Sequence, residues 1–196
     1  MKIVVATKNN HKVGELKAMI NMENIEFFTM KEMGIDLDIE ENGTTFEENA
    51  MIKAKALYNE LNDENLIVIA DDSGLCVDAL NGGPGIYSAR YSGGNDKDNN
   101  NKLLDELKEV PPLKRGAHYV CSIAVVTKNE EKMFTGKCFG LIDKEERGTL
   151  GFGYDPLFYV PEKQKTFGEI EADEKNKISH RANAVKLLKE WLKQIN

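Results

Sequence analysis

The stretch Leu66–Ala70 reads Leu-Ile-Val-Ile-Ala and leads directly into Asp71, Asp72, Ser73 and Gly74. Five consecutive apolar residues, three of them β-branched, predict a buried strand that is covered on both faces, as in the parallel sheets of α/β proteins. In open α/β sheets, ligands collect beyond the carboxyl ends of such strands. We therefore expect the strand to end before the two acids and to present both of them to a ligand.

The two adjacent carboxylates constrain what lies opposite them. Asp71 and Asp72 repel each other and are costly to bury unpaired, so we expect a divalent cation or basic groups in front of them. The alternative is a solvated Asp-Asp-Ser-Gly turn, which needs no ligand. This segment by itself favours neither interpretation over the other.

The balance of charge limits the class of partner. The chain has 196 residues with 33 acidic and 26 basic side chains, which leaves a net charge of −7. This excess of negative charge argues against binding to nucleic-acid phosphates or to anionic lipid. The length suits a single domain spanning residues 1–196, with one core or one core in two lobes.

No apolar segment approaches the length of a membrane span, and the run Ile3–Ala6 is too short for the apolar region of a signal peptide. We therefore expect a cytoplasmic protein without membrane partners. The three cysteines, Cys76, Cys121 and Cys138, lack the spacing of a metal site and lie in apolar or strand-like segments, as buried reduced thiols do. Neither a disulfide nor a zinc site is expected.

A polar loop, Thr7–Lys12, separates a predicted strand at Lys2–Ala6 from a predicted helix whose apolar residues extend from Val13 to Ile20. The loop offers a hydroxyl, amides and two lysines at a helix start, which together suit a phosphate. Lysines at that end oppose the helix dipole by roughly 0.3–1 kcal/mol each, so an anionic partner would explain them. Solvated lysines beside an asparagine cap are the alternative. A Walker A loop is disfavoured because its glycine spacing is absent.

The segment before the next helix is acidic and ends in Glu40 and Glu41, which are candidate partners for Asp72. A helix is predicted to start at Thr45, because Thr45 and Glu48 form a capping-box pattern ahead of apolar residues at helical spacing. Further predicted elements are a strand at Ile25–Phe28, a chain reversal at Asn81–Gly85, a helix from about Asn95, an antiparallel hairpin of His118–Val126 with Met133–Ile142, and a strand at Leu157–Val160.

The C-terminal part contains a loop with two glycines, Gly151–Pro156, and a later helix that begins with basic residues. Phe152 in this loop is placed to stack on a planar ligand. A helix with an apolar face is predicted over 178–195, with Ser179 as its N-cap. The positive charges of His180 and Arg181 at its start are unfavourable next to the positive end of the helix dipole, unless a ligand pairs with them. The alternative is that they pair with the acidic residues in 169–174.

Six motifs occur in order along nearly the whole chain: Thr7-x-Asn9-x-x-Lys12, Glu41-x-Gly43, Ala70–Leu75, Gly83–Arg90, Phe152–Pro156 and Ser179–Arg181. Together they closely resemble the inosine triphosphate pyrophosphatase family, also called XTP/dITP diphosphatases. Any one motif is a weak signal, whereas six in register are specific. The resemblance implies the ITPase-like α/β fold, a long mixed β-sheet with flanking helices that form two lobes around a nucleotide cleft. It also implies a homodimer.

The activity that the resemblance implies is hydrolysis of ITP, dITP and XTP to the nucleoside monophosphate and pyrophosphate, with Mg²⁺ as cofactor. Splitting a triphosphate at the α-phosphorus needs charge neutralisation and a positioned water, which agrees with the lysines and the paired acids. One alternative is a septum-formation (Maf)-type nucleotide pyrophosphatase with another base preference. Another is a non-catalytic nucleotide sensor, although carboxylates beside a phosphate site weaken anion binding unless a metal intervenes.

The resemblance also assigns roles to individual residues. It assigns Asp72 as proton acceptor and magnesium ligand, with Asp71 as the alternative base because neighbouring carboxylates titrate as a coupled pair. Glu41 is favoured as the other metal ligand, with Glu40 retained. The phosphates are assigned to Thr7, Lys8, Asn9, Asn10, His11 and Lys12, of which Lys12 also has a catalytic role. The remaining substrate contacts are Ser73, Phe152, Gly153, Tyr154, Asp155, Lys175, His180 and Arg181.

Selectivity against ATP must be read at the purine edge. Hypoxanthine and xanthine present an oxygen at C6, whereas adenine presents an amino group there. Cationic donors therefore favour the first pair, and Lys175 and Arg181 are the predicted donors. Guanine shares the C6 oxygen, so rejection of GTP needs a second device, which the sequence does not identify.

Overall fold

The computed structural model describes residues 1–195. Its strands are β1 (Lys2–Val5), β2 (Glu26–Thr29), β3 (Leu66–Val77), β4 (Gly116–Val126), β5 (Glu131–Ile142), β6 (Phe158–Val160) and β7 (Lys165–Thr166). They form one seven-stranded sheet in the order β2-β1-β3-β4-β5-β6-β7. β1 pairs in parallel with β2 and β3, whereas β6 pairs antiparallel with β5 and β7. The sheet is therefore mixed, and the predicted α/β class is confirmed.

The helices are α1 (Asn10–Ile20), α2 (Phe46–Leu61), α3 (Asp96–Glu106), α4 (Ala172–Ile178) and α5 (His180–Ile195). The chain divides into two compact units. The first comprises Met1–Asp72, Cys121–Gly136 and the chain from Arg181 onward, and the second comprises Ser73–Val120 and Lys137–His180. Strands β3, β4 and β5 each contribute residues to both units. Each unit has its own core, and the single domain stays a prediction.

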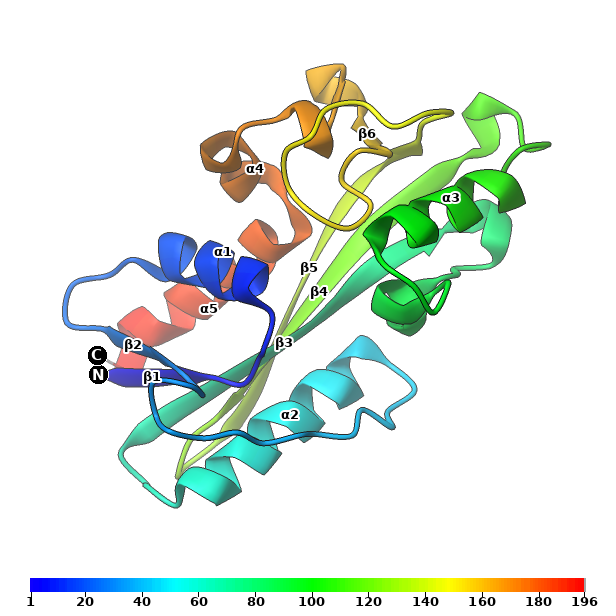
Figure 1. Cartoon of the computed structure of the whole chain (residues 1–196). Coiled ribbons are helices and arrows are strands. Elements are labelled where there is room, and N and C mark those ends of the chain that lie inside the picture. The colour runs from blue at the N-terminus through cyan, green and yellow to red at the C-terminus, as the bar shows by residue number, and fades with distance from the viewer. Residues whose placement is uncertain (196) are drawn as a thin grey trace. The chain divides into compact units, whose positions relative to one another are not determined.

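In the first unit, side-chain alternation along the strands buries both faces of the sheet. Ile67 and Ile69 of β3 pack with α1 and α5, whereas Val68 and Ala70 pack with α2 on the opposite face (Figure 1). Residues two apart in a strand share a face, so a continuous apolar run needs a helix layer on each side. The prediction of a strand covered on both faces is confirmed.

Two helix starts in the first unit use the predicted capping residues. Asn9 Oδ1 accepts hydrogen bonds from the N–H groups of His11 at 2.9 Å and Lys12 at 3.2 Å, so Asn9 is the N-cap of α1. Thr45 caps α2 with its side-chain oxygen, as expected. Because α1 begins at Asn10, the loop is shorter than predicted, and Asn10, His11 and Lys12 form the first helical turn.

The second unit is built around a cluster of aromatic rings. The ring centroid of Phe158 lies 4.8 Å from that of Tyr119 and 5.0 Å from that of Phe167, and all three side chains are buried in one core. Helix α3 adds two leucines to this core, and Asn95 caps it. The predicted helix from about Asn95 is therefore confirmed.

The strands expected at Ile25–Phe28, His118–Val126, Met133–Ile142 and Leu157–Val160 are present within two residues. One other boundary differs from the prediction. β3 continues past Ala70 to Val77, because Leu75 and Val77 enter the core of the second unit. The predicted C-terminal helix is present as α5, which begins directly after Ser179. Lys175 lies in α4, a short helix before Ser179 that the pattern did not predict.

Candidate active site

The two adjacent aspartates lie inside β3 rather than beyond its end. Asp71 and Asp72 are 1% and 8% exposed, which excludes the solvated-turn alternative. Because neighbouring side chains of a strand point to opposite faces, the two carboxylates do not share one environment. Asp71 contacts residues of α1 and α5, whereas Asp72 contacts residues of α2. The expectation of paired acids at a strand end was wrong, since the strand continues and separates them.

Asp71 sits in a buried network of cations. Its Oδ2 accepts hydrogen bonds from Arg181 Nη2 at 2.9 Å and Arg181 Nε at 3.3 Å, and Lys12 Nζ lies 3.3 Å away. Cys121 Sγ donates to the same oxygen at 3.8 Å. Arg181 Nη1 in turn donates to Glu15 Oε2. The guanidinium thereby joins the start of α5 to the end of the apolar run in β3 and to α1.

Electrostatics keep Asp71 ionised. Burial by itself would raise the pKa of Asp71, but the nearby charges of Lys12, Arg181 and Lys53 together hold that pKa well below its usual range. Burial by itself would lower the pKa of Arg181, but the surrounding acidic groups, Asp71 first among them, together raise it. A carboxylate with so low a pKa is a weak base, so Asp71 is poorly suited to accept a proton.

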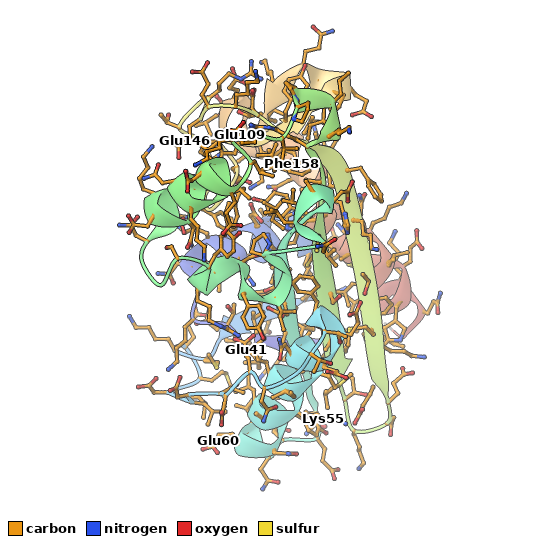
Figure 2. All side chains as sticks on the ribbon, turned by 90° about the vertical axis from the view of Figure 1, so that its right-hand side faces the viewer. Glu41, Lys55, Glu60, Glu109, Glu146 and Phe158 are labelled. Carbon is orange, nitrogen blue, oxygen red and sulfur yellow. The ribbon has the colours of Figure 1, made fainter. Side chains whose placement is uncertain are left out.

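Asp72 has a different environment on the opposite face. Its Oδ2 accepts from Asn49 Nδ2 at 3.3 Å, and its Oδ1 from Lys53 Nζ at 3.4 Å. Lys53 Nζ also donates to Glu41 Oε2 at 2.8 Å, and Figure 2 shows Glu41 beside α2. Burial raises the pKa of Asp72 despite the opposing charges of Lys53 and Lys12. Of the two aspartates, Asp72 is therefore the stronger base.

The acidic loop is fixed to the same helix. Gly43 N–H donates to Asn49 Oδ1 at 2.8 Å, so one amide side chain joins the loop to Asp72. A Cβ atom at Gly43 would lie 2.6 Å from that oxygen, which explains the glycine. Glu41 reaches Lys53, whereas Glu40 is exposed and has no ion pair or hydrogen bond within residues 1–195. Only Glu41 is placed with Asp72.

The phosphate-loop lysines have unequal surroundings. Lys12 Nζ is largely buried against Asp71, with its side chain 14% exposed. Lys8 Nζ lies 3.0 Å from Asp36 Oδ1, and both of these side chains are mostly exposed. Thr7 Oγ1 accepts from the N–H of Asn9 at 3.2 Å, so the loop turns tightly into α1. Lys12 is therefore held in place by the fold, whereas Lys8 is held only by a surface ion pair.

In the second unit, a buried lysine meets a carboxylate and two rings. Lys175 Nζ donates to Asp155 Oδ2 at 2.6 Å, and it lies 4.9 Å and 5.6 Å from the ring centroids of Phe152 and Phe167. Asp155 Oδ2 also accepts from the N–H of Phe152 at 2.9 Å. Gly151 has a φ of +76°, and a Cβ there would lie 2.0 Å from Asp155 Oδ2. The glycine lets the loop fold onto its own carboxylate.

A family model described as Ham1 matches residues 3–191. The chain belongs to the Ham1 family. A dITP/XTP pyrophosphatase of Clostridium perfringens is 51% identical over 200 residues, which cover 99% of this chain and 98% of the relative. One of Thermoanaerobacter pseudethanolicus is 48% identical over 194 residues, covering 98% and 96%. The expected resemblance is thereby confirmed.

Solved structures of Ham1 proteins match the fold over the full chain. The Ham1 protein of Staphylococcus aureus has a TM-score of 0.89 at 42% identity and covers 100% of both chains. A HAM1 protein from Coxiella burnetii has a TM-score of 0.87 at 38% identity and covers 99% of both chains. The ITPase-like fold class is therefore confirmed for this chain.

The remaining predicted contacts of this Ham1 chain fall in three places. Ser73 is half-buried and follows Asp72 in β3. His180 stacks on Tyr119 in the second unit, with ring centroids 4.5 Å apart and planes at 11°. Tyr154 is buried in the core, where its hydroxyl donates to the carbonyl of Ser88 at 2.7 Å. Its side chain therefore supports the loop from within.

Arg181, at the start of α5, bonds to carboxylates of the first unit. Its guanidinium is 0% exposed and donates to Asp71 and Glu15, both of them in the first unit. These contacts fit a role in holding Asp71. The role of Arg181 in reading a base stays a prediction.

Two residues at the site escaped the sequence reasoning. Asn49 and Lys53 are 1% and 8% exposed, and they lie four residues apart on α2, next to the buried Ala50 and Ala54. The prediction of this helix rested on its apolar residues and did not consider that polar residues are buried on the same face. A lysine and an asparagine at adjacent turns of a buried helix face are the signal that could have found them, because such residues are rarely buried unless paired.

The donor set at Asp72 suits a small divalent cation. Within residues 1–195, no cluster of three or more histidine, cysteine or acidic side chains is arranged to hold a metal. Two carboxylates, Glu41 and Asp72, both contact Lys53 Nζ and so lie close to each other. Mg²⁺ prefers oxygen ligands and needs only one or two carboxylates when waters and phosphate oxygens complete its shell.

The described helices of this Ham1 chain include none able to cross a membrane.

Proposed function

We propose that this Ham1 chain hydrolyses ITP, dITP and XTP to the nucleoside monophosphate and pyrophosphate. Relatives named dITP/XTP pyrophosphatase are 51% and 48% identical to it over nearly their whole length. The observation within the chain that carries the proposal is the buried Asp72, whose pKa is raised by burial and which lies beside Lys53. Such a carboxylate is able to take a proton from water, as hydrolysis requires.

Asp72 acts as the proton acceptor in this reaction. It takes a proton from the attacking water, whose oxygen bonds to the α-phosphorus. The bond between that phosphorus and the bridging oxygen breaks, and pyrophosphate leaves with the electron pair. Asp71 is not assigned this role, because Arg181 and Lys12 hold it ionised. Ser73, the next residue of β3, contacts the substrate.

The start of α1 binds the phosphates. Lys12 and Lys8 supply positive charge, and the start of α1 supplies the positive end of a helix dipole. Asp71 orients Lys12 at 3.3 Å, and Arg181 orients Asp71. Arg181 is therefore a positioning residue for the phosphate site. The full set of phosphate contacts is Thr7, Lys8, Asn9, Asn10, His11 and Lys12.

Glu41 and Asp72 would hold Mg²⁺, with Glu40 as the less favoured ligand. One lysine ammonium contacts both carboxylates, Lys53 at 2.8 Å and 3.4 Å, so the two groups are already close enough to share a cation. Bound Mg²⁺ supplies neutralisation of the charge that develops on the phosphates. Lys53 keeps the two carboxylates together and is itself a candidate for phosphate contact.

The second unit supplies the base contacts. Phe152 offers a ring for stacking, and Lys175 is a donor-only group held within 5 Å of that ring. An ammonium can donate to the C6 oxygen of hypoxanthine or xanthine and has nothing to accept from the amino group of adenine. Asp155 orients Lys175. Gly153, Tyr154 and His180 complete the set of residues that hold the base and sugar.

The setting of the reaction follows from charge and family. With a net charge of −7, the chain is repelled by nucleic acid and by anionic membranes, so its partners are free nucleotides. We infer that it works in the cytoplasm and as a homodimer. The Maf-type alternative and the non-catalytic sensor are the competing functions. The raised pKa of Asp72 favours an enzyme over a sensor, because a sensor needs no proton acceptor.

One substrate panel tests the proposal. The purified chain is incubated with ITP, dITP, XTP, ATP, GTP and the pyrimidine triphosphates, with Mg²⁺ or with EDTA, and the products are separated. We expect monophosphate and pyrophosphate from the first three nucleotides, and only with Mg²⁺. Release of orthophosphate would overturn the assignment of the cleaved bond. A preference for pyrimidines would support the Maf-type alternative, and binding without turnover would support the sensor.

A further inference from the structure

Helix α3 carries three consecutive asparagines, Asn99, Asn100 and Asn101. The first two are 2% and 3% exposed, whereas Asn101 is exposed. Asparagine is a poor helix former and is rarely buried without hydrogen-bond partners. Two buried asparagines in succession within a helix therefore call for specific partners, and the two side chains have different ones.

Asn99 bonds to the segment 88–92, which precedes α3. Its Oδ1 accepts from Ser92 N–H and from the Ser92 hydroxyl, both at 2.7 Å. Its Nδ2 donates to the carbonyls of Ser88 at 3.5 Å and Ala89 at 3.4 Å. These bonds fasten the segment that precedes α3, and they account for the burial of Asn99 as part of the architecture.

Asn100 reaches a distant part of the second unit. Its Nδ2 donates to the carbonyl of Gly153 at 3.2 Å and to Glu146 Oε1 at 2.9 Å. One turn earlier, Asp96 Oδ2 accepts from the N–H of Gly153 at 2.8 Å. Residues four apart on a helix lie on one face, so Asp96 and Asn100 hold both backbone polar groups of one loop residue. Lys97 pairs with Glu146, which lies beside α3 (Figure 2).

Gly153 lies in the loop Gly151–Pro156, which carries Phe152. Its φ of +61° lies in the left-handed region, and nothing stands within 4 Å of where a Cβ would be. A glycine in that position has little conformational preference of its own, so outside contacts must fix it. Phe152 precedes it, and the N–H of Phe152 is bonded to Asp155. A shift of Gly153 would therefore displace the ring that faces Lys175.

We propose that Asn100 and Asp96 are specificity-determining positioning residues, which clamp Gly153 and so hold the ring of Phe152 at the distance from Lys175 that base recognition needs. The inference rests on the proposed function, which assigns the base to Phe152 and Lys175. It adds a set of residues on α3 that touch no substrate. Both residues and the loop that they bond belong to the second unit, whereas the phosphate residues belong to the first.

The kinetic test compares the three asparagines. Asn100→Ala is expected to lower kcat/KM for ITP by about 10- to 100-fold, since small misplacements of binding groups can cost about 10²-fold, and to lower the ITP-to-ATP ratio as well. Inhibition by inorganic tripolyphosphate is expected to be unchanged. Asn101→Ala is the exposed control. Asn99→Ala is the buried control, with reduced Tm and an unchanged ratio.

A rescue pair separates positioning from simple destabilisation. Asp96→Asn keeps a side-chain oxygen that can accept from Gly153 and should preserve the ITP-to-ATP ratio, whereas Asp96→Ala should lower it. If Asn100→Ala lowers the rates for ITP and ATP equally, with the fall in Tm that Asn99→Ala shows, the specificity role is refuted. An unchanged ratio in Asp96→Ala would refute it as well.

Hydrogen exchange distinguishes failure of this inference from failure of the proposed function. Backbone exchange in the segment 151–155 should accelerate in Asn100→Ala and not in Asn101→Ala, whatever the enzyme hydrolyses. If exchange is unchanged, Gly153 is not clamped and the inference is overturned while the function stands. If exchange accelerates but the wild-type chain hydrolyses no purine triphosphate, the proposed function fails, and with it the assigned role in base recognition.

Discussion

The two units each bury a lysine against carboxylates, but with a different charge balance. In the first unit, Lys53 contacts two acids, Glu41 and Asp72. In the second, Lys175 pairs with Asp155 between two phenylalanine rings. A surplus of carboxylate invites a metal and leaves one acid able to take a proton. A balanced pair in an aromatic frame instead presents a fixed donor next to a flat apolar surface. The first arrangement suits chemistry on phosphate, and the second suits recognition of a base.

A second comparison lies within the first unit, between the two aspartates of β3. Side-chain alternation gives them different contacts, so Asp71 contacts the cations of α1 and α5, whereas Asp72 contacts residues of α2. The pKa of the first is lowered and that of the second is raised. Environments that move two pKa values apart are how neighbouring carboxylates acquire separate roles. The predictions below test this division.

The largest effect is expected from Asp72→Asn. The amide keeps the shape of the side chain but neither carries charge nor accepts the proton, so kcat for ITP should fall by about 10²–10⁴-fold, the usual contribution of a general base. The Tm should change little, because the variant removes a carboxylate whose ionisation is hindered by burial. Steady-state kinetics and thermal unfolding check both. Near-normal turnover would exclude Asp72 as the base.

Asp71→Asn should instead act on stability. It leaves Arg181 buried without its main carboxylate partner, and breaking a buried ion pair costs about 3–5 kcal/mol. Urea unfolding measures the loss. Arg181→Met in the same background should recover part of it, because the unpaired charge is then gone. A stability equal to that of Asp72→Asn would contradict the proposed difference between the two aspartates.

The difference between the two aspartates should also appear in how the free energy of unfolding changes at acidic pH. The folded pKa of Asp71 lies below its ordinary value of 3.8, so its stabilisation is complete above about that pH and is lost as the pH falls below it. The pKa of Asp72 is raised in the folded protein, so ionisation of Asp72 opposes folding as the pH rises above the ordinary value of 3.8. Unfolding free energies measured from pH 7 to pH 3 should therefore fall less steeply in Asp71→Asn than in the wild type. An unchanged slope would show that Asp71 is not held ionised by its neighbours.

Much of the fold was predictable because it depends on local patterns. The apolar run of β3, the capping residues Asn9 and Thr45, and the alternation in the later strands all act within a few residues. The course of β3 beyond Ala70 was not predictable in this way. Its second half is buried by partners that the sequence places far away, and its small and polar residues resemble a turn.

The sequence named candidate residues for the site but not the contacts between them. The motifs identified Asp71, Asp72 and Arg181, yet Arg181 and Asp71 are 110 positions apart, and no local pattern predicts that they pair. Lys53 and Asn49 were missed for the opposite reason. They lie within a helix that was predicted, but their burial depends on Asp72 across the sheet face.

Lys12→Ala tests the phosphate half of the comparison. It removes a charge-assisted contact worth about 1.5–3 kcal/mol, so the affinity for triphosphates should fall by about 10- to 150-fold while that for nucleosides is unaffected. Titration calorimetry with ITP and with inosine measures the difference. Lys8→Ala is the matched variant, with a smaller loss expected because its ion pair with Asp36 is on the surface. Equal losses for both ligands would exclude a phosphate role for Lys12.

The smallest effect is expected from Lys175→Ala, measured as the ratio of kcat/KM for ITP to that for ATP. Lys175 supports the ring of Phe152 as well as offering a donor, so both substrates should lose some rate when it is removed. Only ITP loses the bond to its C6 oxygen, so the ratio should fall by about tenfold, equivalent to ~1.4 kcal/mol. Asp155→Asn keeps an acceptor for the ammonium and should lower the ratio less. If both rates fall together and the ratio is unchanged, Lys175 supports the ring of Phe152 but does not recognise the base. The assignment of base recognition to the lysine of the second unit is then wrong.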